Sequence, residues 1–349
     1  MAKRLRVGVV GLGMGKGHVK GYQAHPRAEV AAVCDLNEAL LKDKAAEFGV
    51  PETYTDAVTM FKKAGLDAVS IATPNKFHAP LTIAALRQGL HVLCEKPMAM
   101  NAREAQKMLD VAKAKKRNLM INFSYRFTSV SRALKAQVDA GVLGEVYFGR
   151  TVWHRRRGMP KFGGWFGIKE LAGGGPLIDL GVHRLDLALW LMGYPEPVVV
   201  SGSAYNKLAA QAAKRANKPF TVEDLACGMV KFANGATLIV EASWALHIKH
   251  REHMVTRLCG TKGGLVQRNV DGKYQFEAEI YTDEPGGRFT RTIDQVTAGE
   301  GNAMGEFVDS ILEKRAPSAS GEDGVKVMKI LDGIYKSAAT GREVRYGKR

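Results

Sequence analysis

The segment Leu5–Asp35 constrains the fold of this chain more than any other. A mostly β-branched apolar run, Val7–Val10, leads directly into the glycine-rich sequence Gly11–Gly15. A helix-like segment follows, and a second apolar run, Val30–Cys34, ends at Asp35. This order of strand, glycine-rich turn, helix and strand is typical of a unit that binds a dinucleotide, because glycines let the backbone approach a pyrophosphate at the beginning of a helix.

The acidic residue of such a unit is Asp35, which lies 22 residues after Gly13. A carboxylate at this distance can bind the hydroxyls of an adenosine ribose and repels a 2′-phosphate, so we expect NAD rather than NADP. The glycine spacing departs from the usual G-x-G-x-x-G because the third position holds Lys16, which suggests a turn one residue shorter. The residues expected at the cofactor from this segment are Gly11, Gly13, Met14, Gly15 and Asp35.

Length and composition favour an intracellular enzyme with two domains. The chain has 349 residues, and its apolar runs are all shorter than the roughly 18 residues of a membrane helix. The N-terminal residues lead into the first strand almost at once and leave no room for a signal peptide. The four cysteines are scattered, without a C-x-x-C pair. We therefore expect a cytoplasmic protein without disulfides and without membrane association.

The net charge of +16 raises the question of nucleic-acid binding. The basic residues are dispersed, with small clusters near 113–117 and 214–218, and no nucleic-acid-binding motif accompanies them. We expect no nucleic-acid partner, since a cofactor with two phosphates already favours some positive charge. A metal site is not expected either, because the histidines His247, His250 and His253 lie in a Lys/Arg-rich stretch.

Up to about residue 123, strands alternate with helices of about ten residues. This pattern predicts a doubly wound parallel sheet, and one of its helices, 37–48, has Asn37 as its N-cap. Ligands bind such sheets at the carboxyl ends of the strands, where the sequence breaks at Thr73-Pro74-Asn75 and at Glu95-Lys96-Pro97. The further cofactor contacts expected at these ends are Thr73, Pro74, Asn75, His78, Glu95, Lys96 and Asn122.

The pattern changes in 124–349, which we expect to form an α+β domain with a large, mostly antiparallel open sheet. Strands are predicted at about 145–154, 198–205, 224–232, 237–245, 253–259, 265–268, 275–282 and 288–293. Helices are predicted at about 130–140, 176–192, 303–313 and 322–339, and the polar segment 206–219 is expected to be a loop or short helix. The predicted domains are therefore 1–123 for the dinucleotide and 124–349 for substrate binding and oligomerisation.

Two groups of residues are candidates for proton transfer. On the predicted helix 176–192, Asp179, His183 and Asp186 have the spacing i, i+4, i+7 and would share one face. A carboxylate one turn before an imidazole can orient it, although a structural Asp–His pair has the same spacing. At the end of a strand, Lys96 precedes a proline that restricts it to extended geometry. A lysine near a nicotinamide can act as an acid or base, although a surface lysine in a turn has the same pattern.

A glycine-rich aromatic loop, 155–175, lies between a strand and this helix. Trp165 in the loop is a candidate to cover the cofactor or the substrate, with ordinary packing as the alternative. His154, Arg156 and Arg157, at the end of the preceding strand, are candidates to bind substrate oxygens.

Several motifs together resemble the Gfo/Idh/MocA family: GLGMGKGH, IATPNKFHAP, VLCEKPMAM, GGGPLIDLGVHRLDLALWLMG and a closing SAATGREV. The resemblance covers nearly the whole chain. It implies a Rossmann domain, a second domain whose open sheet often serves oligomerisation, and therefore a homodimer or homotetramer. It also implies NAD(P)-dependent oxidation or reduction of sugars and polyols, with Lys96, Asp179 and His183 as the catalytic constellation. These three residues then contact the substrate as well.

Our hypothesis from the sequence is an oxidoreductase that transfers a hydride between nicotinamide and a hydroxyl-bearing carbon of a sugar, anhydrosugar or cyclitol. His183, oriented by Asp179, acts as base and Lys96 polarises the oxygen, although the sequence also permits the reverse assignment. Two alternatives use the same residues or fold. One is a glycosidase that oxidises its substrate transiently with tightly held NAD, and the other is a non-catalytic protein that responds to NAD(H).

Overall fold

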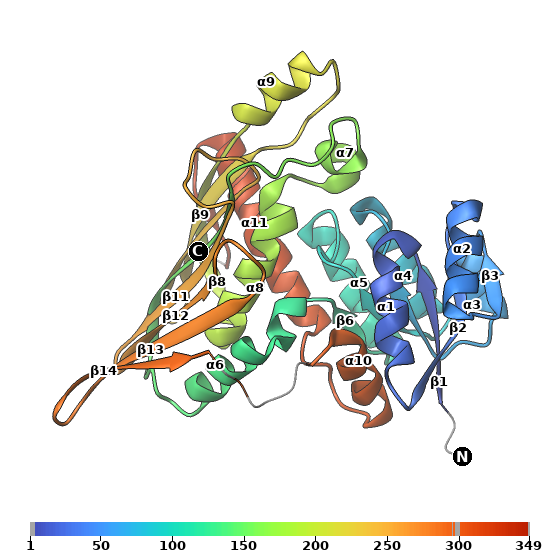
Figure 1. The fold of residues 1–349 in the computed structure, drawn as a ribbon, viewed down its shortest axis with the longest axis horizontal. Helices are drawn as coiled ribbons and strands as arrows, with labels where there is room; N and C mark the ends of the chain where they lie inside the picture. Colours follow the sequence, from blue (N-terminus) through green and yellow to red (C-terminus); the bar gives the residue numbers. More distant parts are fainter. Residues whose placement is uncertain (1–3, 295, 297–300, 348–349) are drawn as a thin grey trace. The chain divides into compact units, whose positions relative to one another are not determined.

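The computed structural model describes residues 4–294, 296 and 301–347, which form two compact units (Figure 1). Unit 1 comprises the described residues up to Phe123 together with Gly301–Met328. Unit 2 begins at Ser124, and Lys329 and the residues after it also belong to it. The sequence analysis assigned all of 301–328 to the second domain, whereas in the structure Gly301–Met328 packs with unit 1. The physical reason is that helix α10 (Ala303–Leu312) packs against helix α1 (Leu12–Gln23) of the nucleotide-binding sheet.

Unit 1 is built on a six-stranded parallel sheet with the order β3-β2-β1-β4-β5-β6. The order reverses between β1 and β4, which is the switch point where doubly wound sheets bind ligands. Apart from the edge strand β3, the strands consist mostly of buried apolar residues because both faces of the sheet are covered. They are β1 (Leu5–Val10), β2 (Ala28–Cys34), β3 (Glu52–Tyr54), β4 (Ala68–Ile71), β5 (His91–Cys94) and β6 (Leu119–Ile121).

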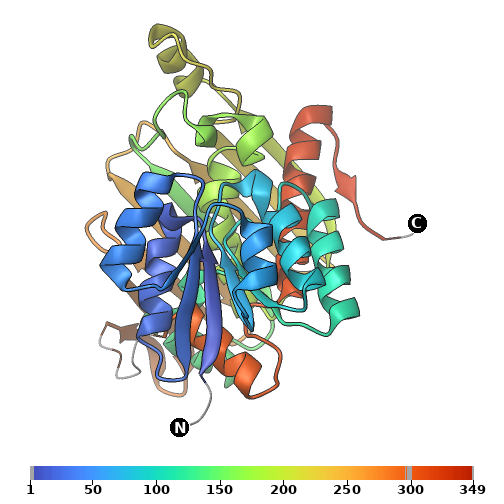
Figure 2. The same ribbon diagram turned by 90° about the vertical axis from the view of Figure 1, so that its right-hand side faces the viewer.

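The helices of unit 1 form two groups on the sheet (Figures 1 and 2): α1 contacts α2 and α10, and α4 contacts α3 and α5. Asn37 caps α2 as predicted, since its side chain accepts a hydrogen bond from the Leu40 N–H at 3.1 Å. The remaining helices are α2 (Glu38–Phe48), α3 (Ala57–Lys63), η1 (Asn75–Phe77), α4 (His78–Arg87) and α5 (Ala102–Lys115).

Unit 2 is built on a nine-stranded sheet with the order β14-β13-β12-β11-β7-β10-β9-β8-β15. All neighbouring pairs are antiparallel except β7 and β10, so the predicted mostly antiparallel sheet is confirmed. Its strands are β7 (Val146–Arg155), β8 (Pro197–Tyr205), β9 (Leu225–Phe232), β10 (Thr237–Ser243), β11 (Glu252–Gly260), β12 (Gly263–Asn269), β13 (Phe276–Glu284), β14 (Gly287–Ile293) and β15 (Val344–Arg345).

Helices of unit 2 pack on one face of this sheet: α6 lies against β13 and β14, and α8 against β7 and β11. The opposite face presents exposed side chains such as Arg150 and Met229. The segment 206–219 contains the short helix α9, as one of the two expectations stated. The helical elements are η2 (Ser124–Phe127), α6 (Ser129–Asp139), η3 (Trp165–Gly167), α7 (Lys169–Ala172), η4 (Leu177–Gly181), α8 (Val182–Leu191), α9 (Leu208–Arg215) and α11 (Gly321–Thr340), whose first turns belong to unit 1.

The predicted helix 176–192 is irregular in the structure. Its first turn, η4, is π-helical, and regular α-helix begins only at Val182. A π turn adds a residue to the turn and changes which side chains share a face, and such turns are frequent at functional sites. The expectation that Asp179, His183 and Asp186 share one α-helical face is therefore corrected. Asp186 instead belongs to the interior of unit 2.

Asp186 forms a buried ion pair with Arg126 of η2. The Nε of Arg126 donates to Asp186 Oδ2 at 2.9 Å and its Nη2 to Oδ1 at 2.6 Å, while Tyr194 also donates to this carboxylate. Arg126 and Asp186 are each at most 2% exposed, so each charge is compensated where water cannot reach it. This pair fixes the orientation of α8 relative to η2.

The four cysteines are free, as predicted. Of the helices in the described residues, none combines the length and apolar character needed to cross a membrane.

Candidate active site

The glycine-rich turn of unit 1 exposes backbone at the carboxyl end of β1. Gly11 has φ = +88° and directly precedes α1, a conformation that favours glycine. A Cβ on Gly15 would lie 2.8 Å from Val9 Cγ1, so Gly15 permits the close contact of α1 with β1. A Cβ on Gly13 would meet no atom within 4 Å. The shortened turn therefore keeps the three roles of its glycines. Gly11 allows the tight turn, Gly13 faces open space at the beginning of a helix, and Gly15 permits close packing of α1 on β1.

Asp35 is anchored at the carboxyl end of the neighbouring strand β2. Its carboxylate accepts a hydrogen bond from the Leu12 N–H at 2.8 Å and from the Asn37 N–H at 2.9 Å. These two donors fix the side chain between the glycine-rich turn and the beginning of α2. Leu36, directly after it, is 85% exposed, so an apolar side chain stands in solvent beside the carboxylate.

Two buried polar atoms lie after the ends of β4 and β6. Among the described residues, Thr73 Oγ1 and Asn122 Oδ1 have no hydrogen-bond partner. Buried polar groups are normally satisfied, and unsatisfied ones at a strand end indicate room for a ligand group. Together with the open space at Gly13, these atoms fit a bound dinucleotide whose polar groups supply the missing partners.

Glu95, after β5, is the centre of a buried polar network. Its carboxylate contacts His18 Nε2 at 2.8 Å, accepts from Asn122 Nδ2 at 2.5 Å and accepts from the Lys96 N–H at 3.1 Å. His18 also contacts Ser70 Oγ through its other ring nitrogen at 3.0 Å. Burial raises the pKa of Glu95, but the hydrogen bond and charge of His18, the Asn122 hydrogen bond and the charge of Lys96 outweigh it and lower the pKa to about 2.

His78 lies just past the end of β4, at the beginning of α4, as the sequence analysis expected. It is 1% exposed, and its ring nitrogens contact Pro97 O at 2.7 Å and Thr73 O at 2.8 Å. Burial lowers the pKa of His78 despite these two contacts. The imidazole joins the segments after β4 and β5, because both of its nitrogens contact backbone oxygens, and its expected contact with the cofactor stays a prediction.

In unit 2, Asp179 and His183 lie in and just after the π turn. Asp179 Oδ2 accepts a hydrogen bond from Trp244 Nε1 at 3.0 Å. The His183 ring lies edge-on to Tyr125, with ring centroids 5.0 Å apart, and 5.8 Å from the ring of Trp153. The two candidate proton-transfer side chains of this unit are thus held by aromatic residues from η2, β7 and the segment after β10.

The beginning of η4 is fixed by the buried carboxylate of Glu223. It accepts from the Gly175 N–H at 2.8 Å, from the Leu177 N–H at 3.1 Å and from the Tyr335 hydroxyl at 2.8 Å. Burial raises the pKa of Glu223, and the hydrogen bonds act in the opposite direction. A Cβ on Gly175 would lie 2.2 Å from Glu223 O, so this turn requires glycine for close approach. Glu223 therefore fixes where the helix that carries Asp179 and His183 begins.

A polar cluster that the sequence analysis missed adjoins these rings. Glu252 accepts from Trp153 Nε1 at 2.7 Å, pairs with Arg155 Nε at 2.8 Å and accepts from the Tyr274 hydroxyl at 3.2 Å. Arg155 also donates to Tyr274 at 2.8 Å. Aromatic rings beside fixed polar groups suit a hydroxyl-rich, partly apolar ligand. The sequence does indicate part of this cluster. Side chains of β7 alternate between the two faces of the sheet, so Trp153 and Arg155 are expected on the same face.

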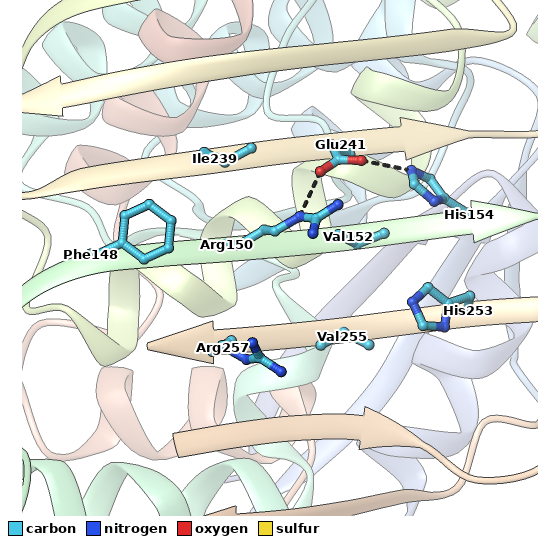
Figure 3. Close-up of a pocket in the computed structure, with 9 residues that line it drawn as sticks. All are labelled: Phe148, Arg150, Val152, His154, Ile239, Glu241, His253, Val255 and Arg257. Atoms are coloured by element: carbon cyan, nitrogen blue, oxygen red, sulfur yellow. Dashed lines mark hydrogen bonds and ion pairs between the residues drawn. The ribbon is translucent and has the colours of Figure 1, made fainter. Parts of the chain in front are cut away.

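His154 points to the other face of the sheet, as Figure 3 shows. It lies 3.5 Å from Glu241 of β10, and its ring is 6.4 Å from that of His253 of β11. Burial lowers its pKa to about 4. The hollow there, of about 640 Å³, lies between β7, β10 and β11. His154 was predicted to bind substrate. Successive strand residues face opposite sides, so His154 does not share the face of Trp153, and its predicted substrate contact stays a prediction.

The remaining loop candidates are placed as follows. Arg156 donates to Lys249 O at 3.4 Å, and Arg157 donates to Leu246 O at 3.2 Å, so both side chains contact the segment after β10. The Trp165 ring stacks on Phe166 with centroids 3.9 Å apart. Their predicted contacts with substrate or cofactor stay predictions. Among the described residues, no group of three or more His, Cys, Asp or Glu side chains is arranged to hold a metal ion.

Two family models match this chain. One, described as "Oxidoreductase family, NAD-binding Rossmann fold", matches residues 5–123. The other, described as "Oxidoreductase family, C-terminal alpha/beta domain", matches residues 135–346. The chain belongs to the Gfo/Idh/MocA family. The resemblance found in the sequence is thereby confirmed, and the first unit is an NAD-binding Rossmann domain.

Relatives within this family share both domains. The chain is 34% identical to D-glucoside 3-dehydrogenase of Escherichia coli (strain K12), over 97% of each chain. It is 29% identical to levoglucosan dehydrogenase of Pseudarthrobacter phenanthrenivorans, also over 97% of each chain. Among solved structures, it is similar to a levoglucosan dehydrogenase in complex with NADH and levoglucosan, with a TM-score of 0.87, 27% identity and coverage of 98% of this chain and 99% of the other.

The Glu95 network of this Gfo/Idh/MocA protein predicts a specific acid sensitivity. A carboxyl whose folded-state pKa is lowered stabilises the fold above its unfolded pKa, near 4.5, and loses this contribution as the pH falls towards about 2. We expect Glu95→Gln to reduce the free energy of unfolding near neutral pH and the difference from wild type to narrow below pH 4.5. Urea unfolding followed by circular dichroism measures the free energy of unfolding. Tryptophan fluorescence is less suitable for a residue of unit 1, because the four tryptophans all lie in unit 2.

Glu47→Gln is the matched control, because Glu47 lies on the surface of α2 and, among the residues that the structure describes, forms an ion pair with Lys44 alone. A constant difference between Glu95→Gln and wild type from neutral pH to pH 2.5 would contradict the assignment of a charged Glu95.

Proposed function

We propose that this chain is an NAD-dependent dehydrogenase that oxidises a CH–OH group of a sugar, anhydrosugar or cyclitol. The observation that carries the proposal is that each of the two units of this family architecture contains a preorganised group of polar side chains. Unit 1 has a dinucleotide turn and Lys96 at a strand end beside the Glu95 network. Unit 2 has Asp179 and His183 held at a helix beginning beside aromatic and polar side chains. The 34% identity to a D-glucoside dehydrogenase supports a carbohydrate substrate.

The cofactor would be held by the glycine-rich turn, Asp35 and the strand-end atoms Thr73 Oγ1 and Asn122 Oδ1. When bound, the nicotinamide supplies the acceptor for the hydride that leaves the substrate carbon. In the proposed mechanism, His183 accepts the proton of the substrate hydroxyl at a ring nitrogen. Lys96 donates a hydrogen bond to the same oxygen and stabilises its developing negative charge.

The groups around these residues have supporting roles in the proposal. Asp179, held by Trp244, favours an orientation of His183 that suits proton transfer and stabilises the imidazolium that results. The Arg155–Glu252–Tyr274 cluster binds further hydroxyls of the substrate, while the rings of Trp153 and Tyr125 contact its apolar face.

Replacement of Lys96 tests the assignment of catalytic groups. We expect Lys96→Met to lower kcat by about 10²–10⁴-fold, because the oxygen loses the hydrogen bond that stabilises its charge. The measurement is NADH formation at 340 nm with a panel of inositols, aldoses, anhydrosugars and glycosides. Fluorescence titration with NADH shows in parallel that the cofactor still binds.

Lys107→Met is the control, since Lys107 is exposed on α5. Turnover of Lys96→Met within about threefold of wild type would remove Lys96 from the mechanism. Cleavage of a glycoside without net NADH formation by the wild-type protein would replace the dehydrogenase with a redox-neutral glycosidase. Inertness towards the whole panel, with NADH bound, would favour a binding protein.

We propose in addition that Asp35 selects NAD over NADP. Its carboxylate is fixed by the Leu12 and Asn37 N–H groups, so it cannot turn away from a 2′-phosphate without losing both hydrogen bonds. We expect Asp35→Asn, which keeps an acceptor oxygen and removes the charge, to lower the KM ratio of NADP to NAD by at least about tenfold. Steady-state kinetics with both cofactors measures the ratio. An unchanged ratio would contradict the role of Asp35.

We further propose that the open face of the unit 2 sheet joins copies of this chain into a homodimer or homotetramer. Apolar side chains such as Val152, Ile239 and Val255 lie on this face beside Arg150 and Glu241, a mixture that suits self-association (Figure 3). We expect light scattering to give two or four chain masses for wild type and one for Ile239→Lys. A monomeric wild type at micromolar concentration would refute the proposal.

A further inference from the structure

Arg184, the residue after His183, is a buried cation without a counter-charge. Its side chain is 0% exposed. Nη1 donates to Gln267 Oε1 at 3.1 Å, and Nη2 donates to Thr256 Oγ1 at 2.6 Å. Nε has no hydrogen-bond partner, and among the described residues no carboxylate pairs with the guanidinium. The groups that bind Arg184 are therefore neutral.

The same unit contains a second buried arginine, Arg126, whose charge is neutralised by a carboxylate. Arg126, 2% exposed, pairs with Asp186 through three hydrogen bonds. Burying a charge without such a partner costs several kcal/mol even after local relaxation. Burial lowers the pKa of Arg184 to about 10, which still leaves it charged near neutral pH. A cost of this size, one residue from a candidate base, indicates a function other than stability.

The residue that binds the Arg184 guanidinium at position 267 is a neutral glutamine, where a carboxylate of similar shape would also fit. Gln267 is 0% exposed, contacts the guanidinium directly and donates from Nε2 to Ser131 Oγ at 2.8 Å. A glutamate in the same position would have nearly the same shape and would neutralise Arg184. The Ser131 hydroxyl could then donate to the carboxylate. The site is therefore built to hold the guanidinium and to leave its charge in place.

The charge lies against an aromatic ring that also contacts His183. Arg184 Cζ is 6.0 Å from the ring centroid of Tyr125, and that ring is 5.0 Å from the His183 ring. The guanidinium and the imidazole thus both lie beside the ring of Tyr125 in the interior of unit 2. A second ring, Phe276, lies 5.7 Å from Arg184 Cζ.

We propose that Arg184 is a positioning residue whose buried positive charge, acting across Tyr125, favours the uncharged imidazole of His183. For its catalytic consequence this rests on the proposed function, in which His183 must be uncharged to accept the substrate proton. The electrostatic effect itself exists in the free protein. A fixed cation disfavours a second positive charge nearby, so it keeps the base ready at neutral pH.

The size of the effect follows from Coulomb's law. At an effective dielectric constant of about 20 and a separation of roughly 10 Å, one charge shifts a neighbouring titration by about one pH unit. The other charged groups around the same aromatic cluster are Asp179 and the Arg155–Glu252 pair, with Tyr274 as a further titratable group. Lys96 joins them in the proposed mechanism. These groups are unchanged in the variants below, so their contributions cancel in the comparison.

The experiment is an NMR titration of His183 in the free protein, with the signal assigned through His183→Gln. We expect Arg184→Met to raise the titration midpoint of His183 by about one pH unit. Gln267→Glu should raise it as well, although Arg184 stays in place, because the charge is then neutralised. Arg184→Lys, which keeps a positive charge at this position, should leave the midpoint close to that of wild type, so its comparison with Arg184→Met separates charge from packing. Gln267→Glu also keeps the test valid if Arg184→Met fails to fold.

Activity and stability give two further measurements. A higher midpoint moves the acid limb of the kcat/KM profile to higher pH by the same amount in Arg184→Met and Gln267→Glu, with no change well above it. The temperature of thermal unfolding should be unchanged or higher in Arg184→Met and Gln267→Glu. The control Arg126→Met should unfold at a lower temperature, because it leaves the buried carboxylate of Asp186 without its counter-charge.

An unmoved His183 midpoint in Gln267→Glu would overturn the proposal. A moved midpoint in a protein that is inactive towards all substrates would retain it and refute the proposed function instead.

Discussion

The buried carboxylate of Glu95 is the constraint on which the nucleotide-binding unit depends. A charge at 8% exposure requires hydrogen-bond donors, and they come from two other elements, through His18 of α1 and Asn122 after β6, and from the neighbouring backbone N–H of Lys96. The same imidazole contacts Ser70 of β4. One carboxylate thus fixes the helix beginning that faces a pyrophosphate and the strand end that carries the proposed catalytic lysine.

Unit 2 contains three different arrangements around buried charges, and each arrangement has a different consequence. Arg126 and Asp186 neutralise each other and hold α8 in place. Glu223 is held by backbone N–H groups and a tyrosine hydroxyl, which fixes the beginning of η4. Arg184 is held only by neutral groups, so its field extends towards His183. The first two arrangements stabilise the fold, and the third, in our proposal, modifies the chemistry.

Much of this architecture could be predicted from local patterns. The alternation of apolar runs and helices predicted the parallel sheet, and Asn37 was recognised as a cap because capping depends on neighbouring residues only. The direction in which individual side chains point was harder to predict. His154 was grouped with Arg156 and Arg157 by proximity in sequence, but successive residues of a strand face opposite sides, so His154 does not share the face of Trp153 and Arg155. His78 was expected at the cofactor because it lies just past a strand end, but the sequence did not indicate that two backbone oxygens contact its ring nitrogens.

The sequence by itself determined the Rossmann order, the glycine-rich turn with Asp35, and the family, because these rest on short-range spacing and on chain-long motifs. Only the tertiary structure decided that 301–328 packs on the first unit and that the helix of Asp179 and His183 begins with a π turn. It also revealed the Arg155–Glu252–Tyr274 cluster and the unpaired Arg184. The physical reason is that burial and hydrogen-bond partners join residues far apart in the chain, such as Arg184 and Gln267, and no local pattern records them.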